Sequence, residues 1–315
     1  MSLKNSELQY YDSNVLRLPS EKRTEYHAQV DNLIAELRKH ITSNSDLKIA
    51  KVVKAGSFAK YTILKKTIDD PIDVDVVFYI SDKNVDDATL DNLNDLIYTL
   101  LTKIYPTKAV EDFEIQRRAA TVTFVKSGLS VDVVPIIQDT QEPNHGWQYD
   151  LKTKDKNLTC APCHIQFIRD RKNSDKHYRT LVRMAKRWKN FVCPPGLKSF
   201  HIELIIAYLQ DRDGPTQNIE QRFREFLGFI AQSKLNERID FPENSSKMQK
   251  YFSDPVVIVD PANHENNVAS RITEKEKSEI IAKALQAWEA AHYASVEDDN
   301  DLWKEIFGPK FKIKD

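Results

Sequence analysis

Two aspartates stand two positions apart in an otherwise apolar segment, residues 72–80, which reads IDVDVVFYI. Its β-branched and aromatic residues predict a strand, so Asp73 and Asp75 would point to the same face of a sheet. Two carboxylates on a buried strand are costly, because desolvation and like-charge repulsion both penalise them, and a bound divalent cation removes that cost. The alternative is that one of these aspartates ends the strand in solvent.

A third aspartate repeats this pattern. Asp132 lies within a predicted strand at 129–137, and a Lys-Ser-Gly turn joins that strand to another at 119–125, which predicts a hairpin. Three carboxylates on adjacent strands can hold two Mg²⁺ ions about 3.5–4 Å apart, the arrangement used for in-line phosphoryl transfer. Oxygen ligands suit Mg²⁺ or Mn²⁺. We therefore predict that Asp73, Asp75 and Asp132 are both metal ligands and catalytic residues.

A Gly-Ser pair lies upstream of these aspartates. Gly56 and Ser57 open the segment GSFAK directly after a short predicted strand at 48–53. Such a pair at the start of a helix offers backbone N–H groups and a hydroxyl to a phosphate. Taken alone, most pairs of this kind are only turns. The aspartate strands that follow favour a nucleotide site.

The elements that must position these residues fall into two groups. Strands alternate with helices up to about residue 163, after which strand signals nearly stop and helices dominate. This order predicts an α+β fold, in which a mixed sheet with helices is joined to a helical lobe. We divide the chain into residues 1–162 and 163–315 and expect any site in the cleft between the two lobes. The helices of the second lobe are predicted at roughly 173–191, 199–211, 217–236 and 273–293.

Basic residues of the second lobe could bind an anion. Arg179, Arg183 and Lys186 recur at i, i+4 and i+7 on one face of a predicted helix, although a solvated basic stripe would show the same spacing. Ser199 begins the next predicted helix, where the helix dipole and free N–H groups favour an anion. Lys198 would assist there, or it is an ordinary exposed lysine.

Composition excludes several classes of protein. The chain has 7 glycines in 315 residues and contains neither GxGxxG nor GxxxxGK[ST], which argues against the common doubly wound nucleotide sites. No apolar run is long enough for a membrane span, and the first residues contain no apolar signal segment, so we expect a cytoplasmic protein. The net charge of −1 does not favour binding to a nucleic acid duplex.

Three cysteines suggest a reducing compartment and no disulfide framework. Cys160, Cys163 and His164 form a CxxCH motif, but covalent haem attachment would require export. A Zn²⁺ site with these three residues, with or without Cys193, is chemically reasonable. The short spacing between histidine and cysteine would strain such a site, and there is no second CxxC motif. Ordinary packing is therefore our expectation for the cysteines.

The motifs in their order resemble those of the polymerase-β-like nucleotidyltransferases: GSFAK, then DVDVVFYI, then VDVVPI. The second lobe resembles the branch that contains oligoadenylate synthases and cGAS-like enzymes, through LVRMAKRWK, LKSFHIELIIAYL, VVIVDPANHENNVA and WKEIFGPKF. Overall, the chain looks like the bacterial CD-NTases of the CBASS anti-phage systems, and particularly like their clade C. One departure is a longer segment before Asp73, around residues 67–71, where Asp69 and Asp70 could confuse the register.

The resemblance implies roles for individual residues. Asp73 and Asp75 would bind both metals, and Asp132 would bind the catalytic metal beside the acceptor hydroxyl. Ser57 would bind the β- or γ-phosphate of the donor nucleotide, whose α-phosphorus is attacked with release of pyrophosphate. Lys186 and Ser199 match positions that hold the triphosphate. The full set of implied nucleotide-binding residues is Gly56, Ser57, Lys60, Lys186, Lys198 and Ser199.

The implied activity is synthesis of a cyclic oligonucleotide second messenger from ATP, with cyclic triadenylate as the leading product. The implied partners are a HORMA-domain regulator and a downstream effector that the product activates. A nucleic acid activator is not required in this reading, although a local basic groove with Arg169, Arg171 and Lys172 stays open. The alternatives are a linear oligoadenylate synthase or tRNA end-adding enzyme, an inactive nucleotide-binding regulator, and a transferase that modifies a protein or drug. The near-neutral charge disfavours the tRNA enzyme.

Overall fold

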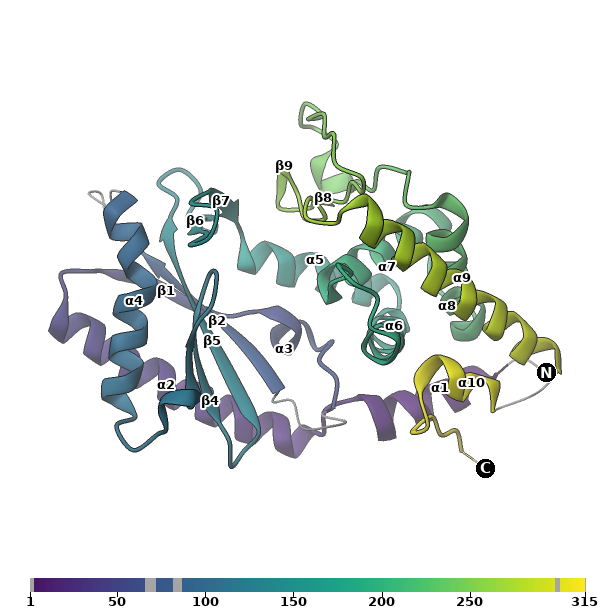
Figure 1. Cartoon of the computed structure of the whole chain (residues 1–315), viewed down its shortest axis with the longest axis horizontal. Coiled ribbons are helices and arrows are strands. Elements are labelled where there is room, and N and C mark those ends of the chain that lie inside the picture. Colours follow the sequence, from purple (N-terminus) through teal and green to yellow (C-terminus); the bar gives the residue numbers. More distant parts are fainter. Residues whose placement is uncertain (1–2, 66–71, 82–86, 298–300, 315) are drawn as a thin grey trace. The chain divides into compact units, whose positions relative to one another are not determined.

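The computed structural model describes residues 3–65, 72–81, 87–297 and 301–314 of the chain. The longer segment at 67–71, with Asp69 and Asp70, lies outside the described residues. The chain forms two compact units (Figure 1). The sheet unit comprises residues 18–61 and 65–165, and the helical unit comprises residues 1–17, 62–64 and 166–315.

The sheet unit is built on a mixed seven-stranded sheet. Strands β2 (Ile72–Ile80) and β5 (Leu129–Gln138) lie parallel at its centre, and the other pairings are antiparallel. The main strand order is β1-β2-β5-β4-β3, with β1 at Ile49–Lys54, β4 at Ala120–Phe124 and β3 at Phe113–Ile115. The end of β5 also pairs with β6 (Gly146–Tyr149), which pairs with β7 (Lys156–Thr159).

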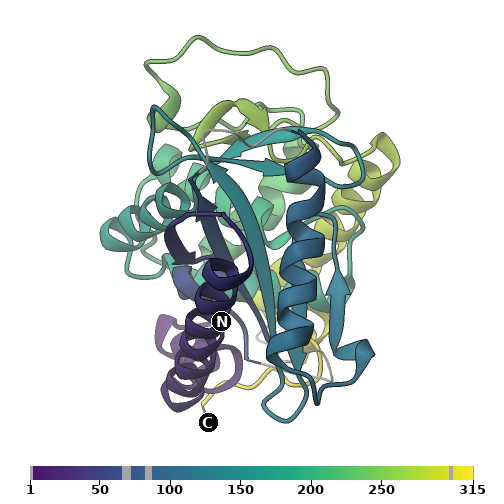
Figure 2. The same cartoon turned by 90° about the vertical axis from the view of Figure 1, so that its left-hand side faces the viewer.

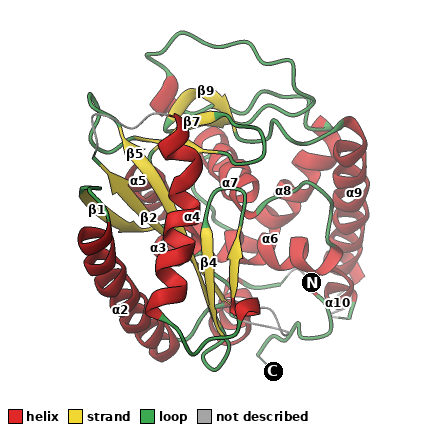
Figure 3. Cartoon of the chain, turned by 60° about the vertical axis from the view of Figure 1, so that its left-hand side comes forward, coloured by secondary structure: helices red, strands yellow, loops and turns green. Residues whose placement is uncertain are grey.

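Two long helices cover one face of this sheet. Helix α4 (Asp87–Ile104) contacts β3, β4 and β5, and it also contacts α2 (Ser20–Asn44) (Figures 2 and 3). The apolar residues of α2 recur every three or four positions and are buried. Along β2, alternate residues point to opposite faces, so Val74, Val76 and Phe78 are fully buried on the face that the aspartates do not share.

The helical unit has one continuous apolar core. Its long helices are α6 (Tyr178–Val192), α7 (Ser199–Asp213), α8 (Ile219–Ser233) and α9 (Glu274–Glu297). Its smaller elements are α1 (Asn5–Tyr11), the π-helix η1 (Asp12–Leu16), the 3-10 helix η3 (Pro242–Asn244), the hairpin β8–β9 (Val259–Asp260, Asn263–Asn267) and α10 (Leu302–Phe307). Large aromatic side chains fill the core: Trp188, Phe223, Phe226, Trp303 and Phe307.

A buried ion pair attaches the N-terminal segment to α6. The guanidinium of Arg183 donates to Asp12 Oδ1 at 2.5 Å and to Oδ2 at 2.6 Å, and Thr180 and Arg17 also donate to this carboxylate. Burial acts to raise the pKa of Asp12, but the hydrogen bonds and charges of Arg183 and Arg17 together outweigh burial and hold that pKa below its usual value. The first residues of the chain are therefore part of the helical unit.

The predicted mixed α+β fold is confirmed. Helix α5 (Ala161–Ser174) begins in the sheet unit and continues into the helical unit, with the boundary after Ile165. Among the described residues, no helix is long and apolar enough to cross a membrane.

Candidate active site

The three aspartates occupy adjacent strands on one face of the sheet. Asp75 of β2 pairs in register with Asp132 of the parallel strand β5, so both side chains point to the same face, and Asp73 joins them two positions earlier. The predicted hairpin before Asp132 is also present, because β4 and β5 pair antiparallel. The carboxylate constellation expected from the sequence is therefore assembled by strand register.

The carboxylates lie at one end of a face whose other end is apolar. Beyond them on the same face, Val77 and Tyr79 of β2 and Val134 and Ile136 of β5 belong to a buried cluster. Asp73 is exposed, whereas Asp75 and Asp132 are half-buried. The exposed end of this face is therefore the end that carries the carboxylates.

Thr121 fixes the orientation of Asp132. It lies directly across from Asp132 on β4, and its Oγ1 donates a 2.6 Å hydrogen bond to Asp132 Oδ1. Burial raises the pKa of Asp132 above its usual value, the hydrogen bond from Thr121 opposes that shift, and the nearby charge of Glu114 adds to it. An environment that penalises the charged carboxylate is one in which a bound cation gives a large benefit. Thr121 carries no motif of its own in the sequence, and its place opposite Asp132 in the predicted hairpin is the signal that points to it.

The Gly-Ser turn packs directly against Asp75. It begins the short helix α3 (Gly56–Lys60), and the N–H of the preceding Ala55 donates to the carbonyl of Asp75 at 2.7 Å. Gly56 has φ +59°, and a Cβ at this position would lie 1.7 Å from Asp75 Oδ2. Only glycine fits both the backbone and the space. The turn thus brings Ser57, which is half-buried, beside the carboxylate face.

Lys60 ends α3 and is buried, with 7% of its surface exposed. The turn that follows it is held by Arg23, whose guanidinium donates to the carbonyl of Phe58 at 2.9 Å and lies over the ring of Tyr61. The side chain of Lys60 is therefore buried within the sheet unit. Its ammonium group would have to move toward the surface to contact a nucleotide.

Lys186 is not on a solvated face. It is 3% exposed, and its Nζ donates to Glu203 Oε1 at 2.6 Å and to Thr62 Oγ1 at 2.9 Å. Thr62 Oγ1 also donates to the same carboxylate oxygen at 2.6 Å. The alternative of a solvated basic stripe is wrong, because Arg183 is buried as well. Glu203 was not predicted as a site residue, although it lies within the motif LKSFHIELIIAYL.

Lys198 and Ser199 form the start of α7. Lys198 precedes the helix and is exposed, and Ser199 is its first residue. The backbone N–H of Lys198 donates to His201 Nδ1 at 3.2 Å, so His201 carries its proton on Nε2 and donates it to the carbonyl of Val268 at 3.0 Å. Burial lowers the pKa of His201 to about 4. The neutral histidine thus caps the helix and ties its first turn to the segment after β9.

The sequence left open a basic groove with Arg169, Arg171 and Lys172, and the structure removes Arg171 from it. Arg171 is buried, donates to Asp211 at 2.7 Å and to Glu243, and lies over the ring of Phe167. Burial would lower the pKa of Arg171, but the hydrogen bonds to Glu243 and Asp211 outweigh burial and raise it. Its positive charge is therefore paired with carboxylates inside the helical unit.

Parallel strands that carry three carboxylates beside a Gly-Ser turn, within a mixed sheet, define the class: the protein is a nucleotidyltransferase. Residues 1–171 match the family model of the Second Messenger Oligonucleotide or Dinucleotide Synthetase domain. The chain is 54% identical over 316 residues to a CBASS oligonucleotide cyclase CdnC from Escherichia coli strain KTE188, covering 100% of this chain and 99% of the relative. The chain therefore belongs to the family of CBASS oligonucleotide cyclases.

Other relatives agree with this assignment. A cyclic AMP-AMP-AMP synthase of E. coli strain MS 115-1 is 30% identical over 308 residues, covering 94% of each chain. The structure of E. coli MS115-1 CdnC with ATP superposes with a TM-score of 0.84 at 29% identity, covering 98% of this chain and 99% of that one. The GTP-bound form of Vibrio cholerae DncV shares the fold, with a TM-score of 0.73 at 13% identity and coverage of 98% and 96%. The protein is thus an enzyme that makes a cyclic oligonucleotide in anti-phage defence.

Proposed function

We propose that the protein joins three ATP molecules into cyclic triadenylate. The observation that carries the chemistry is the register that pairs Asp75 with Asp132 and places Thr121 against the second of them. The choice of substrate and product is supported by the 30% identical relative, which is named a cyclic AMP-AMP-AMP synthase, and by the likeness to a CdnC solved with ATP.

The carboxylate face fits divalent cations, because burial raises the pKa of Asp132 and a cation beside it would favour the charged form. We propose that Asp73, Asp75 and Asp132 hold two Mg²⁺ ions, with Mn²⁺ as a substitute, and that the bound ions neutralise charge on the reacting phosphates. The hydrogen bond from Thr121 keeps one oxygen of Asp132 in a fixed direction. The other oxygen is left to face the acceptor hydroxyl and favour loss of its proton.

The remaining residues bind and orient the nucleotide. The backbone of Gly56 and the hydroxyl of Ser57 would donate hydrogen bonds to the donor phosphates, with Lys60 nearby in the chain. Lys198 and Ser199 would bind the triphosphate at the start of α7. Attack on the α-phosphorus then releases pyrophosphate without a covalent intermediate, since positioning and charge stabilisation are sufficient.

Lys186 belongs to this proposal on resemblance alone. Its ammonium already donates to Glu203 and Thr62. A contact with phosphate therefore requires that Lys186 exchange one of these acceptors for a phosphate oxygen when the nucleotide binds.

We propose that a HORMA-domain protein regulates the enzyme, as a solved complex of E. coli MS115-1 CdnC with HORMA suggests for that relative. The cyclic product would act on a downstream effector. Nucleic acid would not be required, since Arg171 is paired with Asp211 and Glu243 and the net charge is −1. We place the reaction in the cytoplasm, where nucleoside triphosphates are available.

The proposal is tested by incubating the purified enzyme with all four nucleoside triphosphates and Mg²⁺, alone, with its HORMA-domain partner, and with duplex DNA or RNA. Mass spectrometry should identify a cyclic trimer of AMP that resists alkaline phosphatase, and the HORMA-domain partner should increase its yield. Phosphatase-sensitive linear chains as the main product would favour the linear synthase instead. Activation by nucleic acid without the partner protein would contradict the proposed regulation.

A further inference from the structure

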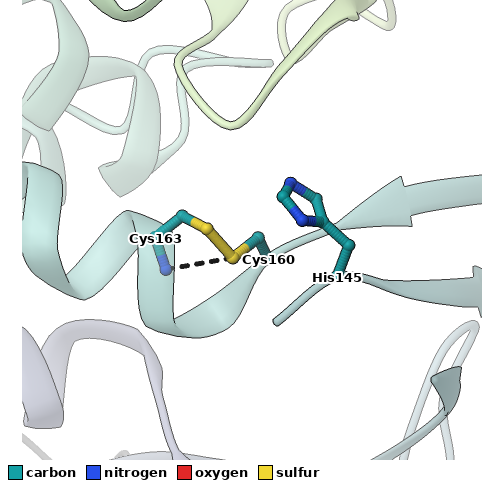
Figure 4. A group of neighbouring side chains, drawn as sticks. All are labelled: His145, Cys160 and Cys163. Atoms are coloured by element: carbon teal, nitrogen blue, oxygen red, sulfur yellow. Dashed lines mark hydrogen bonds between the residues drawn. A yellow bond between two sulfur atoms is a disulfide. The ribbon is translucent and has the colours of Figure 1, made fainter. Parts of the chain in front are cut away.

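The cysteine pair lies at the start of α5. Cys160 directly precedes the helix and is fully buried, and Cys163 lies in its first turn (Figure 4). The two residues form a disulfide with their Cα atoms 5.2 Å apart, and the N–H of Cys163 donates to Cys160 Sγ at 3.1 Å. The sequence predicted no disulfide framework, and this single bridge closes only a four-residue loop. The third cysteine, Cys193, is free and exposed at the end of α6.

A histidine from another element converges on this pair. One ring nitrogen of His145 and the sulfurs of Cys160 and Cys163 all lie within 4.8 Å of one another (Figure 4). The sequence pointed to His164 instead, because it is adjacent to Cys163. Within the described part of the chain, these three residues form a histidine and cysteine group whose ligand atoms are close enough together to hold one metal ion.

Strand register explains why this histidine arrives there. Gly146 of β6 pairs with Thr159 of the antiparallel strand β7, so the next residue outward on each strand is His145 on one side and Cys160 on the other. Gly146 allows β6 to approach β5, because a Cβ at this position would lie 2.6 Å from a methyl group of Ile136. The β6–β7 ladder therefore ends directly beside His145 and Cys160 and brings these two residues together.

The loop before His145 is also ordered by its own hydrogen bonds. Asp139 accepts the N–H groups of Gln141 and Glu142 and the ring N–H of Trp147. The carboxylate of Glu142 lies 2.8 Å from Nδ1 of His145. A carboxylate against the imidazole either orients a metal-binding histidine or supplies a further oxygen ligand.

We propose that the reduced protein binds one Zn²⁺ ion through His145, Cys160 and Cys163. Two thiolates and one imidazole are ligands that Zn²⁺ prefers. In a tetrahedral site with Zn–S distances of about 2.3 Å and a Zn–N distance of about 2.0 Å, the ligand atoms lie less than 4.8 Å apart, so the separation of these three atoms fits such a site. Glu142 or a water molecule completes the four ligands.

The disulfide and the metal exclude each other. Reduction of the bridge takes two electrons and two protons from a dithiol, which itself becomes a disulfide, and gives two thiols. Zn²⁺ then displaces both thiol protons and binds the thiolates. Either form ties the start of α5 in place, but only the metal form also joins it to His145 and thus to the β5–β6 connection.

The experiment uses the full-length protein, reduced with an excess of a phosphine reductant under anaerobic conditions and freed of metal with a chelator. Excess Mg²⁺ is present so that the active-site carboxylates are occupied. Titration with Co²⁺ should give about one equivalent bound with a thiolate-to-metal charge-transfer absorption in the near ultraviolet, and Zn²⁺ should displace it. The oxidised protein should show no such absorption.

Matched variants decide which residues bind the metal. His145→Gln should weaken Zn²⁺ binding at least about tenfold while the fold is retained, and His164→Gln should leave it unchanged, as should Cys193→Ser. Cys160→Ser should abolish the charge-transfer absorption, and Cys163→Ser serves the same purpose if the buried Cys160 variant does not fold. Wild-type affinity in the His145 variant, loss of binding in the His164 variant, or no charge-transfer absorption in the reduced wild type would overturn the proposal.

Discussion

At the scale of single residues, the carboxylates of Asp73, Asp75 and Asp132 have distinct surroundings on one shared face. Replacing any one of them with asparagine removes a negative ligand of the proposed metal site, so each substitution should abolish product formation while the protein stays folded. The losses should not be additive, since the three residues act as one unit. Product yield by mass spectrometry and the thermal unfolding midpoint together check this, and wild-type turnover in one variant would remove that residue from the site.

Thr121 should affect the reaction rate by orienting Asp132 and not by contacting the substrate. Thr121→Val removes the 2.6 Å hydrogen bond to Asp132, and because a hydrogen bond to a charged group is worth about 1.5–3 kcal/mol, we expect kcat to fall roughly 10- to 100-fold. That hydrogen bond opposes the upward pKa shift of Asp132, so its loss should raise the pKa further and move the acidic limb of the rate profile to higher pH.

The measurement is kcat and KM against pH at fixed Mg²⁺ concentration. Thr121→Ser keeps the hydroxyl and serves as the matched control, with kinetics near those of the wild type. An equal loss in both variants, or an acidic limb that does not move in the valine variant, would show that Thr121 is only a packing residue.

At the scale of secondary-structure elements, the start of α7 depends on a neutral histidine. The folded protein holds the pKa of His201 at about 4, whereas the unfolded chain has the ordinary value of 6.5. Between these pH values only the unfolded chain takes up the proton, so stability should be lost as the pH falls from 6.5 to 4, by on the order of 3 kcal/mol. Unfolding by urea at several pH values checks this. His201→Gln should show a weaker pH dependence, and parallel curves for the two proteins would contradict it.

The contact of α6 with α7 offers a test of Lys186. Lys186→Met should destabilise the protein by about 3–5 kcal/mol, because Glu203 is left buried without its counter-charge. The double variant Lys186→Met with Glu203→Leu should regain much of that stability. If Lys186 binds phosphate, the double variant should still show a raised KM for ATP. A KM restored to the wild-type value would make the lysine purely structural.

The sequence predicted these elements unevenly, and the reason is physical. The strands at 72–80 and 129–137 were found because their side-chain pattern is local. The burial of Arg183 and Lys186 was not found, since their partners Asp12 and Glu203 come from other elements and no local pattern records such pairs. His145 was missed for the same reason, as only the pairing of β6 with β7 brings it to the cysteines.

At the scale of the whole molecule, the N-terminal segment belongs to the unit formed by the C-terminal half of the chain. The predicted division at residue 162 lies within a few residues of the boundary in α5, but it assigned residues 1–17 to the first lobe, whereas they pack in the helical unit. This assignment could not be read from the sequence, because the contact that anchors the segment joins Asp12 to Arg183 across most of the chain.

Loss of that anchor should therefore destabilise the protein. Asp12→Ala leaves Arg183 buried without its counter-charge and should cost about 3–5 kcal/mol of unfolding free energy. Arg17→Ala removes the half-exposed partner of the same carboxylate and should cost no more than about 1 kcal/mol. Thermal or denaturant unfolding of the two variants checks the contrast, and similar losses would show that the buried pair is not the anchor.

The parallel pairing of β2 with β5 has a consequence for synthesis of the protein. Parallel strands need a long crossover, and here α4, β3 and β4 all lie between the two strands in the sequence. Asp75 and Asp132 therefore become neighbours only after the whole crossover has been translated and folded, which is a slow, non-local step. A chain that ends within the crossover carries Asp73 and Asp75 but lacks Asp132. Under the proposed mechanism, such an incomplete translation product makes no messenger.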